Sequence, residues 1–281
     1  MQHGWLKYVM RSPPPVTAPS NVDRLRGLRY AWRVPILLLL ILLAMPLGVL
    51  VALLPATARD ARHEPLSQRI VRGWSRALLR GAFGIRIRSA GAQVVGPVLL
   101  VANHISWMDI QLLHTQRAVC FVAKAEIARW PLIGWLAARA GTIFHRRGHS
   151  ASLNAVMAVM VRRLCSGRAV AVFPEGGIEH ADGGITRVRI FHARVFQCAL
   201  DAAVPIQPVA LTYRRGGCSY DDVSFRPGEG FLDNFLRLLG TAPIDAEVRF
   251  LAPLTEPAEN GRRALAEAAR SAIARSLEAN P

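Results

Sequence analysis

From Gly84 to the C-terminus, short apolar or alternating runs are separated by stretches in which apolar residues recur every three or four positions. Short runs are typical of strands, and the recurring spacing is typical of amphipathic helices. The runs predict strands at residues 85–88, 98–102, 118–122, 142–144, 169–173, 206–212 and 247–251. The recurring pattern predicts helices at residues 108–113, 130–140, 150–164, 190–203 and 262–279. Because strands and helices alternate, we expect an α/β domain with a largely parallel central sheet flanked by helices.

The most apolar part of the chain precedes this domain. Residues 34–58 carry no charge and contain the run Ile36–Leu43, and an uncharged segment of this length could cross a bilayer. Pro35 interrupts the segment, and Pro46 with Gly48 predicts a kink near its middle. The pattern therefore leaves two alternatives open, a straight span and a bent helix that enters one leaflet.

Basic residues stand on both sides of the apolar segment, so they do not orient a single span. Their distribution suits an N-terminal membrane-inserted helical hairpin with both ends on the cytoplasmic face. Residues 68–83 also favour the lipid interface, since basic and apolar side chains fall on separate helical faces. These side chains are Arg69, Arg72, Arg76 and Arg80 on one face and Val71, Trp74 and Leu78 on the other. An ordinary surface helix is the alternative. A signal peptide cleaved after Ala58 is disfavoured, because the preceding tail and the apolar run are both too long.

The chain is thus expected to have three parts: a basic, partly disordered tail at 1–33, a membrane anchor at 34–83 and a globular domain at 84–281. The formal net charge is +16, and 52% of the residues are hydrophobic. This combination favours an anionic membrane surface over nucleic acid, since nucleic-acid-binding domains are usually basic and polar. The four cysteines lack the spacing of zinc sites or disulfide frameworks. We therefore expect no structural disulfide and no metal site.

Candidate chemistry begins with His104 and Asp109, which follow a predicted buried strand where a helix starts. Ligands of open α/β sheets bind at the carboxyl ends of strands. A histidine at this position can act as a general base, and a nearby aspartate can orient its imidazole. A helix-capping aspartate beside an unrelated surface histidine is the alternative.

Two later segments also follow predicted strands. Arg147, at the end of the stretch 141–147, could bind a phosphate through paired donors, or it could belong to a solvated basic turn. In the stretch 173–177, glycines allow backbone N–H groups to approach an anion, and Glu175 could accept a hydrogen bond from a substrate hydroxyl. A simple strand-ending turn is the alternative for this stretch.

Taken together and in order, four segments resemble the motifs of the 1-acylglycerol-3-phosphate O-acyltransferase family of glycerolipid enzymes, over about residues 66–255. The first motif, N-H-x-x-x-x-D, is matched by Asn103, His104 and Asp109. The second, G-x-x-F-x-x-R, is matched by Gly141, Phe144 and Arg147, and the third, F-P-E-G, by Phe173, Pro174, Glu175 and Gly176. The fourth, V-P-I-x-P-V, is matched by Val204, Pro205, Ile206, Pro208 and Val209. Residues 121–126 and 130–134 resemble the family's segment between the first two motifs.

The resemblance implies that residues 84–281 form a catalytic domain that moves an acyl group from acyl-CoA or acyl carrier protein to the hydroxyl of a lysolipid. His104 would be the base and Asp109 its orienting carboxylate. The substrate-binding residues would be Lys124, Gly141, Phe144, Arg147, Glu175, Gly176 and Gly177. The thioester is already activated, so the reaction needs a base, an oxyanion donor and positioning, and no cofactor or metal.

Two departures from the family's usual residues concern the acceptor. Gly177-Ile178 and Phe191-His-Ala-Arg194 depart from the residues usual in the family, and both changes lie near the expected acceptor site. We expect lysophosphatidic acid as the acceptor, with lyso-ornithine lipid or another lysolipid as the alternative. A non-catalytic basic membrane-binding protein is the remote alternative. The expected partners are membrane lipids and the acyl donor, without nucleic acid, and the expected location is the inner membrane with the domain on its cytoplasmic face.

Overall fold

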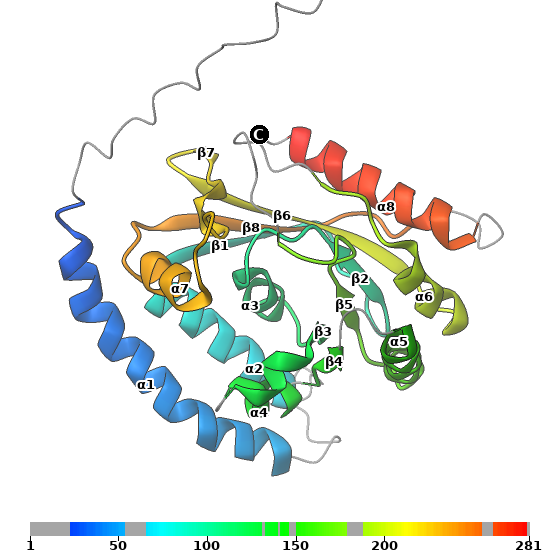
Figure 1. The fold of residues 1–281 in the computed structure, drawn as a ribbon, viewed down its shortest axis with the longest axis horizontal. Coiled ribbons are helices and arrows are strands. Elements are labelled where there is room, and N and C mark those ends of the chain that lie inside the picture. The colour runs from blue at the N-terminus through cyan, green and yellow to red at the C-terminus, as the bar shows by residue number, and fades with distance from the viewer. Residues whose placement is uncertain are drawn as a thin grey trace, which may run out of the picture.

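A computed structural model describes residues 23–53, 66–130, 133–139, 141–145, 150–178, 188–254 and 261–279. Its centre is an eight-stranded sheet with the order β1-β8-β6-β2-β5-β3-β4, and β7 pairs with β6 (Figure 1). The strands are β1 (Ile85–Ala90), β2 (Leu99–Ala102), β3 (Cys120–Lys124), β4 (Ile143–His145), β5 (Val170–Val172), β6 (Ile206–Arg215), β7 (Cys218–Ser219) and β8 (Ile244–Phe250). Pairing is parallel except where β6 meets β7 and β8. The predicted α/β class with a largely parallel sheet is confirmed.

Helices cover both faces of the sheet. They are α1 (Arg26–Leu53), α2 (Leu66–Ala77), α3 (Met108–His114), α4 (Ile133–Arg139), α5 (Ser150–Cys165), α6 (Gln197–Asp201), α7 (Phe231–Leu239) and α8 (Gly261–Glu278). In β2, Leu100 packs in the core on the side of α3 and α7, whereas Leu99 and Val101 pack in the core on the side of α5 and α8. Successive strand residues point to opposite faces, so a fully apolar strand supplies both cores.

The apolar segment near the N-terminus forms one helix, and here the expectation of a hairpin is not supported. Helix α1 continues through both Pro35 and Pro46, and Figure 1 shows it running along the outside of the domain. Each proline removes one helical hydrogen bond, but packing along the domain compensates for this loss. At Gly48, for example, an added Cβ would lie 2.5 Å from Trp135 Cζ3, so glycine lets α1 approach α4 closely. Residues 54–65, which follow α1, lie outside the described residues.

The N-terminal half of α1 is fastened to the end of α7. The Tyr30 hydroxyl donates to the Leu236 carbonyl at 2.7 Å. The buried Arg33 guanidinium donates to the carbonyls of Leu239 at 2.8 Å and Thr241 at 2.7 Å. The last carbonyls of a helix have no partner within it, so these donors complete the C-terminal end of α7.

Several elements differ from the sequence expectation, among them the following three. The helix expected at residues 190–203 is confined to a 3₁₀ turn at 193–196 and α6, because His192 N–H instead donates to the Pro174 carbonyl at 2.9 Å. Strand β8 begins at Ile244, three residues before the expected start, where it pairs with β1. Helix α7 was not expected at all.

Candidate active site

The loop from Asn103 to Trp107 leaves the carboxyl end of β2 and leads into α3. Its start is fixed by Asn103, whose buried side chain donates to the Leu211 carbonyl at 3.0 Å and accepts from the Leu211 N–H at 2.8 Å. These two bonds join the end of β2 to the neighbouring strand β6. The loop therefore starts from a rigid edge of the sheet, at the place where α/β proteins bind ligands.

His104 and Asp109 contact each other directly. His104 Nδ1 lies 2.8 Å from Asp109 Oδ2, and the Asp109 side chain is fully buried. The same carboxylate oxygen accepts the backbone N–H groups of Ile105 at 2.7 Å and Ser106 at 2.9 Å. The other oxygen accepts the Tyr213 hydroxyl at 2.7 Å. Four donors therefore hold this buried carboxylate, which satisfies the requirement that a buried charge be fully hydrogen-bonded.

This network orients the imidazole. A carboxylate beside Nδ1 favours the tautomer with the proton on Nδ1, which leaves Nε2 of a neutral histidine as the proton acceptor. Burial raises the pKa of Tyr213 well above its usual 10, and the charge of Asp109 raises it further. Tyr213 therefore remains a hydrogen-bond donor to Asp109 throughout the neutral pH range.

Glu175 links the His104 loop to the segment after β5. Its Oε1 accepts the backbone N–H of His104 at 2.9 Å. Its Oε2 accepts from the backbone N and the Nε of Arg189, at 3.2 and 3.3 Å, and Arg189 also donates to the Gly177 carbonyl. The Phe173 ring stacks on the His104 imidazole, with 4.0 Å between the ring centres. The first and third sequence motifs thus meet around His104.

His104 opens on a cavity of about 580 Å³. Gly176 and Gly177 form part of its wall. Gly176 has φ +78°, and an added Cβ would lie 3.2 Å from the His192 ring, so glycine suits this position. Apolar side chains such as Val156 and Met160 from α5 line another part of the wall. The rim carries the exposed guanidiniums of Arg194, Arg262 and Arg263. The site therefore combines an oriented base, an apolar wall and positive charge.

The remaining predicted residues are only partly placed. Gly141 has φ +88° and lies against Cys120, so a Cβ there would be strained. Phe144 lies within β4 and is half-buried. Lys124 is the last residue of β3, but its side chain is outside the described part of the structure, as is the whole of Arg147. The structure thus brings together His104, Asp109, Glu175, Gly176 and Gly177.

Tyr213 and Arg189 were not expected at the site from the sequence. Tyr213 lies one residue beyond the predicted end of its strand, and no local pattern separates it from an ordinary core tyrosine. Arg189 is one of many arginines in the chain. Among the described residues, no group of three or more His, Cys, Asp or Glu side chains is arranged to hold a metal ion.

Comparisons with known proteins agree with this geometry. The family described as Acyltransferase matches residues 86–212. A lyso-ornithine lipid O-acyltransferase from Pseudomonas aeruginosa is 38% identical over 210 residues, which cover 74% of this chain and 78% of that protein. A 1-acyl-sn-glycerol-3-phosphate acyltransferase from Neisseria gonorrhoeae is 32% identical over 146 residues, 50% of this chain and 56% of that protein. The crystal structure of a 1-acyl-sn-glycerophosphate acyltransferase from Thermotoga maritima has the same fold, with a TM-score of 0.62 and 19% identity over 90% of this chain and 96% of that one.

The fold, the His104–Asp109 pair and these matches define the class of the protein, which is an acyltransferase. The chain belongs to the lysophospholipid acyltransferase family. The family resemblance of the four motifs is therefore confirmed.

Proposed function

We propose that this protein transfers a fatty acyl group from a thioester donor to the hydroxyl of a membrane lysolipid, with His104 as the general base. The observation that carries the proposal is the buried, fourfold-bonded Asp109 beside a histidine that lines the cavity. A base needs reach to the substrate proton and a fixed orientation. The cavity supplies the reach, and Asp109 supplies the orientation.

The reaction follows from this arrangement. His104 Nε2 removes the proton of the acceptor hydroxyl as its oxygen attacks the thioester carbonyl. The tetrahedral intermediate then collapses, the carbon–sulfur bond breaks, and the imidazolium returns its proton to the departing thiolate. Asp109 stabilises the imidazolium that forms between these steps, as the aspartate of a hydrolase triad does. The products are the acylated lipid and a free thiol.

We further propose lyso-ornithine lipid as the acceptor, in place of the lysophosphatidic acid that we expected first. Support comes from the lyso-ornithine lipid acyltransferases, which match this chain over more residues and at higher identity than the Neisseria relative does. Lysophosphatidic acid remains the second candidate, because the Neisseria protein matches half of the chain and the four motifs resemble its family. Both acceptors carry an anionic group, a carboxylate in one and a phosphate in the other. The positive rim at Arg194, Arg262 and Arg263 suits either anion.

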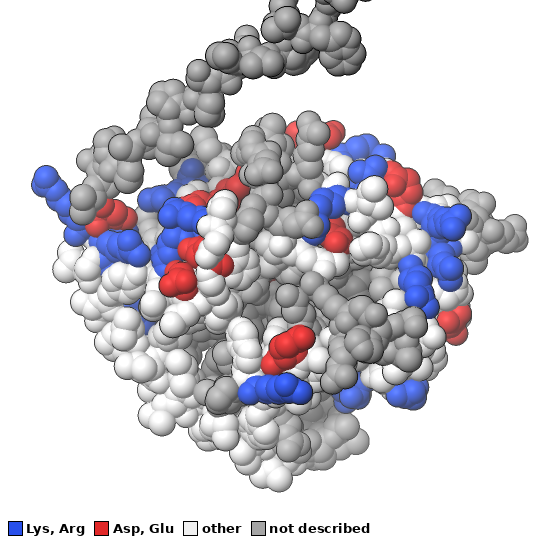
Figure 2. Space-filling model, in the orientation of Figure 1, with Lys and Arg blue, Asp and Glu red and all other residues white. Residues whose placement is uncertain are grey.

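The anchor fits a membrane-bound acceptor. Helix α1 is long and apolar enough to cross a membrane, and its large exposed side chains include Leu28, Trp32, Leu42 and Leu53. Figure 2 shows the lower left surface, where α1 runs in Figure 1, as largely uncharged. Because α1 packs on the domain at α7, α2 and α4, we propose that it lies in one leaflet of the inner membrane and holds the domain against the cytoplasmic surface.

The acceptor test uses the full-length protein in anionic vesicles that contain lyso-ornithine lipid or lysophosphatidic acid. Radiolabelled acyl-CoA and acyl-acyl carrier protein are supplied in separate arms, and the labelled lipid is extracted. The proposal predicts a higher kcat/KM with lyso-ornithine lipid. A clear preference for lysophosphatidic acid would reverse the assignment of the acceptor. Transfer to neither lipid, with either donor, would contradict the proposed function itself.

The contribution of Arg147 is tested in the same assay with Arg147→Lys. If Arg147 binds the acceptor anion, the substitution removes one of two parallel hydrogen bonds. A charge-assisted bond of about 1.5–3 kcal/mol corresponds to a loss of about ten- to hundredfold in kcat/KM. The KM of the donor should stay close to the wild-type value. Unchanged kinetics with both acceptors would show that Arg147 does not contact the acceptor.

A further inference from the structure

Trp107 lies on the loop between His104 and Asp109, and α7 holds it firmly. Its ring packs against Phe83, Phe231 and Phe235, with ring centres 5.4, 5.6 and 5.5 Å away. Its indole N–H donates to Asn234 Oδ1 at 2.9 Å. The residue after Trp107 begins α3, and the next is Asp109. Any shift of this tryptophan therefore moves the backbone that carries both members of the His104–Asp109 pair.

Asn234 is oriented by partners other than Trp107. The Asn234 side chain is fully buried. Its amide Nδ2 donates to the Ser224 carbonyl at 2.9 Å and to Glu229 Oε2 at 3.0 Å. Both of these partners can only accept hydrogen bonds, so the amide cannot flip without losing both. Its Oδ1 is therefore fixed toward the indole of Trp107.

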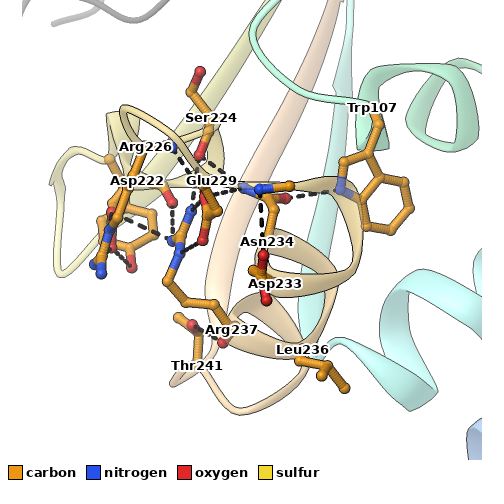
Figure 3. Close-up of polar contacts among 12 residues, drawn as sticks. Trp107, Asp222, Ser224, Arg226, Glu229, Asp233, Asn234, Leu236, Arg237 and Thr241 are labelled. Atoms are coloured by element: carbon orange, nitrogen blue, oxygen red, sulfur yellow. Dashed lines mark hydrogen bonds and ion pairs between the residues drawn. The ribbon is translucent and has the colours of Figure 1, made fainter.

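The carboxylate that fixes Asn234 is itself held by Arg237, and Figure 3 shows these side chains converging beside Trp107. Arg237 Nε and Nη2 donate to the two oxygens of Glu229 at 2.6 and 2.8 Å. The hydrogen bond from Arg237 is the largest factor that lowers the pKa of Glu229, to about 2. Glu229 therefore stays ionised and remains an acceptor for Asn234 at neutral pH. Arg237 also donates to the Asp222 carbonyl at 2.5 Å, which ties the cluster to the preceding loop.

We propose that Asn234 is a positioning residue, which acts through Trp107 on the orientation of the His104–Asp109 pair. This inference rests on the proposed function, since it concerns the same reaction. Asn234 reaches no part of the cavity wall, so its effect is expected in the chemical step and not in substrate binding. A displacement of about 1 Å far from the reacting atoms can cost about a hundredfold in rate. We expect Asn234→Ala to lower kcat by roughly ten- to hundredfold, with both KM values within about twofold of wild type.

A double-mutant cycle tests the connection through Trp107. Trp107→Phe keeps an aromatic ring for the packing against α7 and removes the indole N–H together with part of the ring system. If Asn234 acts through this bond, the kcat of the double variant should be no lower than that of the more impaired single variant. Losses that multiply would show independent effects and would overturn the proposal. A change confined to KM would also overturn it.

Two further variants distinguish a positioning role of Asn234 from a loss of stability and from a failure of the proposed function. Leu238→Ala removes a buried side chain of α7 and serves as a control for destabilisation. If the two variants lower the thermal midpoint by the same amount, Asn234→Ala should still have a clearly lower kcat than Leu238→Ala. Equal kcat values would show that Asn234 has only a structural role. His104→Ala is assayed in parallel. An inactive His104→Ala together with a fully active Asn234→Ala would refute the inference alone, whereas an active His104→Ala would refute the proposed function.

Discussion

The hydroxyl of Tyr213 provides a test of how Asp109 is held. Tyr213→Phe keeps the buried ring and its packing and removes only the donor to Asp109 Oδ1, which lies 2.7 Å from the hydroxyl. After the change, Asp109 Oδ2 retains its three donors, and Oδ1 loses the partner that the structure shows. The perturbation is therefore confined to one end of the carboxylate.

The magnitude follows from the charge of the acceptor. A hydrogen bond to an ionised group contributes about 1.5–3 kcal/mol, and about 1.4 kcal/mol corresponds to a tenfold change. We expect kcat to fall by about ten- to hundredfold, because Asp109 must stabilise the imidazolium that forms during the reaction. Burial keeps the pKa of Tyr213 well above 10, so the hydroxyl remains protonated, and its hydrogen bond to Asp109 is present, from about pH 6 to about pH 9.

The assay is labelled acyl transfer to the preferred lysolipid in vesicles, with the thermal midpoint measured on the same samples. Tyr220→Phe is the matched control, since it removes a hydroxyl that donates to Asp222 at 3.1 Å, outside the cavity lining. This control should keep wild-type kinetics. A kcat of Tyr213→Phe within about twofold of wild type would refute the idea that Tyr213 supports the base through Asp109.

Three further predictions concern stability and the loop at the site. Burial lowers the pKa of His114 from 6.5 to about 4. As the pH falls, the unfolded chain therefore takes up a proton on this histidine before the folded chain does. The free energy of unfolding should then decrease by up to roughly 3 kcal/mol as the pH falls from about 6.5 to about 4. His114→Leu should remove this dependence in thermal melts, and an unchanged acid slope would contradict the prediction. Gly48→Leu should weaken the packing of α1 on Trp135, at a cost of about 1–3 kcal/mol in denaturant titrations in detergent, and no change in midpoint would argue against this contact. Glu175→Gln keeps an acceptor for the N–H of His104, so its kcat should exceed that of Glu175→Ala, which should be about tenfold or more below wild type. Equal rates for the two variants would show that this hydrogen bond does not matter.

Much of the fold could be predicted because its signals are local. The buried strand β2, the start of α3 and the apolar stripe of α5 each follow from residues adjacent in the sequence. Helix α7 was not expected, although its nine residues carry apolar side chains at helical spacing, such as Phe231, Phe235 and Leu238. It is also held by tertiary contacts with α1 and Trp107. The expected hairpin is not supported for a related reason, because proline predicts a break only where tertiary packing does not compensate for the lost hydrogen bond.

The candidate site divides in the same way. His104 and Asp109 are five residues apart, on the loop after β2 and in the first turn of α3, so their contact could be predicted from their spacing. Tyr213 meets Asp109 across 104 residues of sequence, and Asn234 meets Trp107 across 127. Such contacts depend on strand order and helix placement, for which a single sequence carries no local signal. The network that supports the pair therefore emerged only from the structure.

His104 is proposed as the base of an acyl transfer to a lysolipid. The most direct measurement compares single-turnover acyl transfer by wild type, His104→Ala and Asp109→Asn in vesicles that contain the preferred acceptor. Removing a general base costs about 10²–10⁴ in rate, so both variants should lose at least a hundredfold while keeping membrane binding. His104→Ala should also keep the wild-type thermal midpoint, whereas Asp109→Asn is expected to lower it, because an amide cannot accept all four hydrogen bonds of the buried carboxylate. Near-wild-type transfer by His104→Ala would contradict the account.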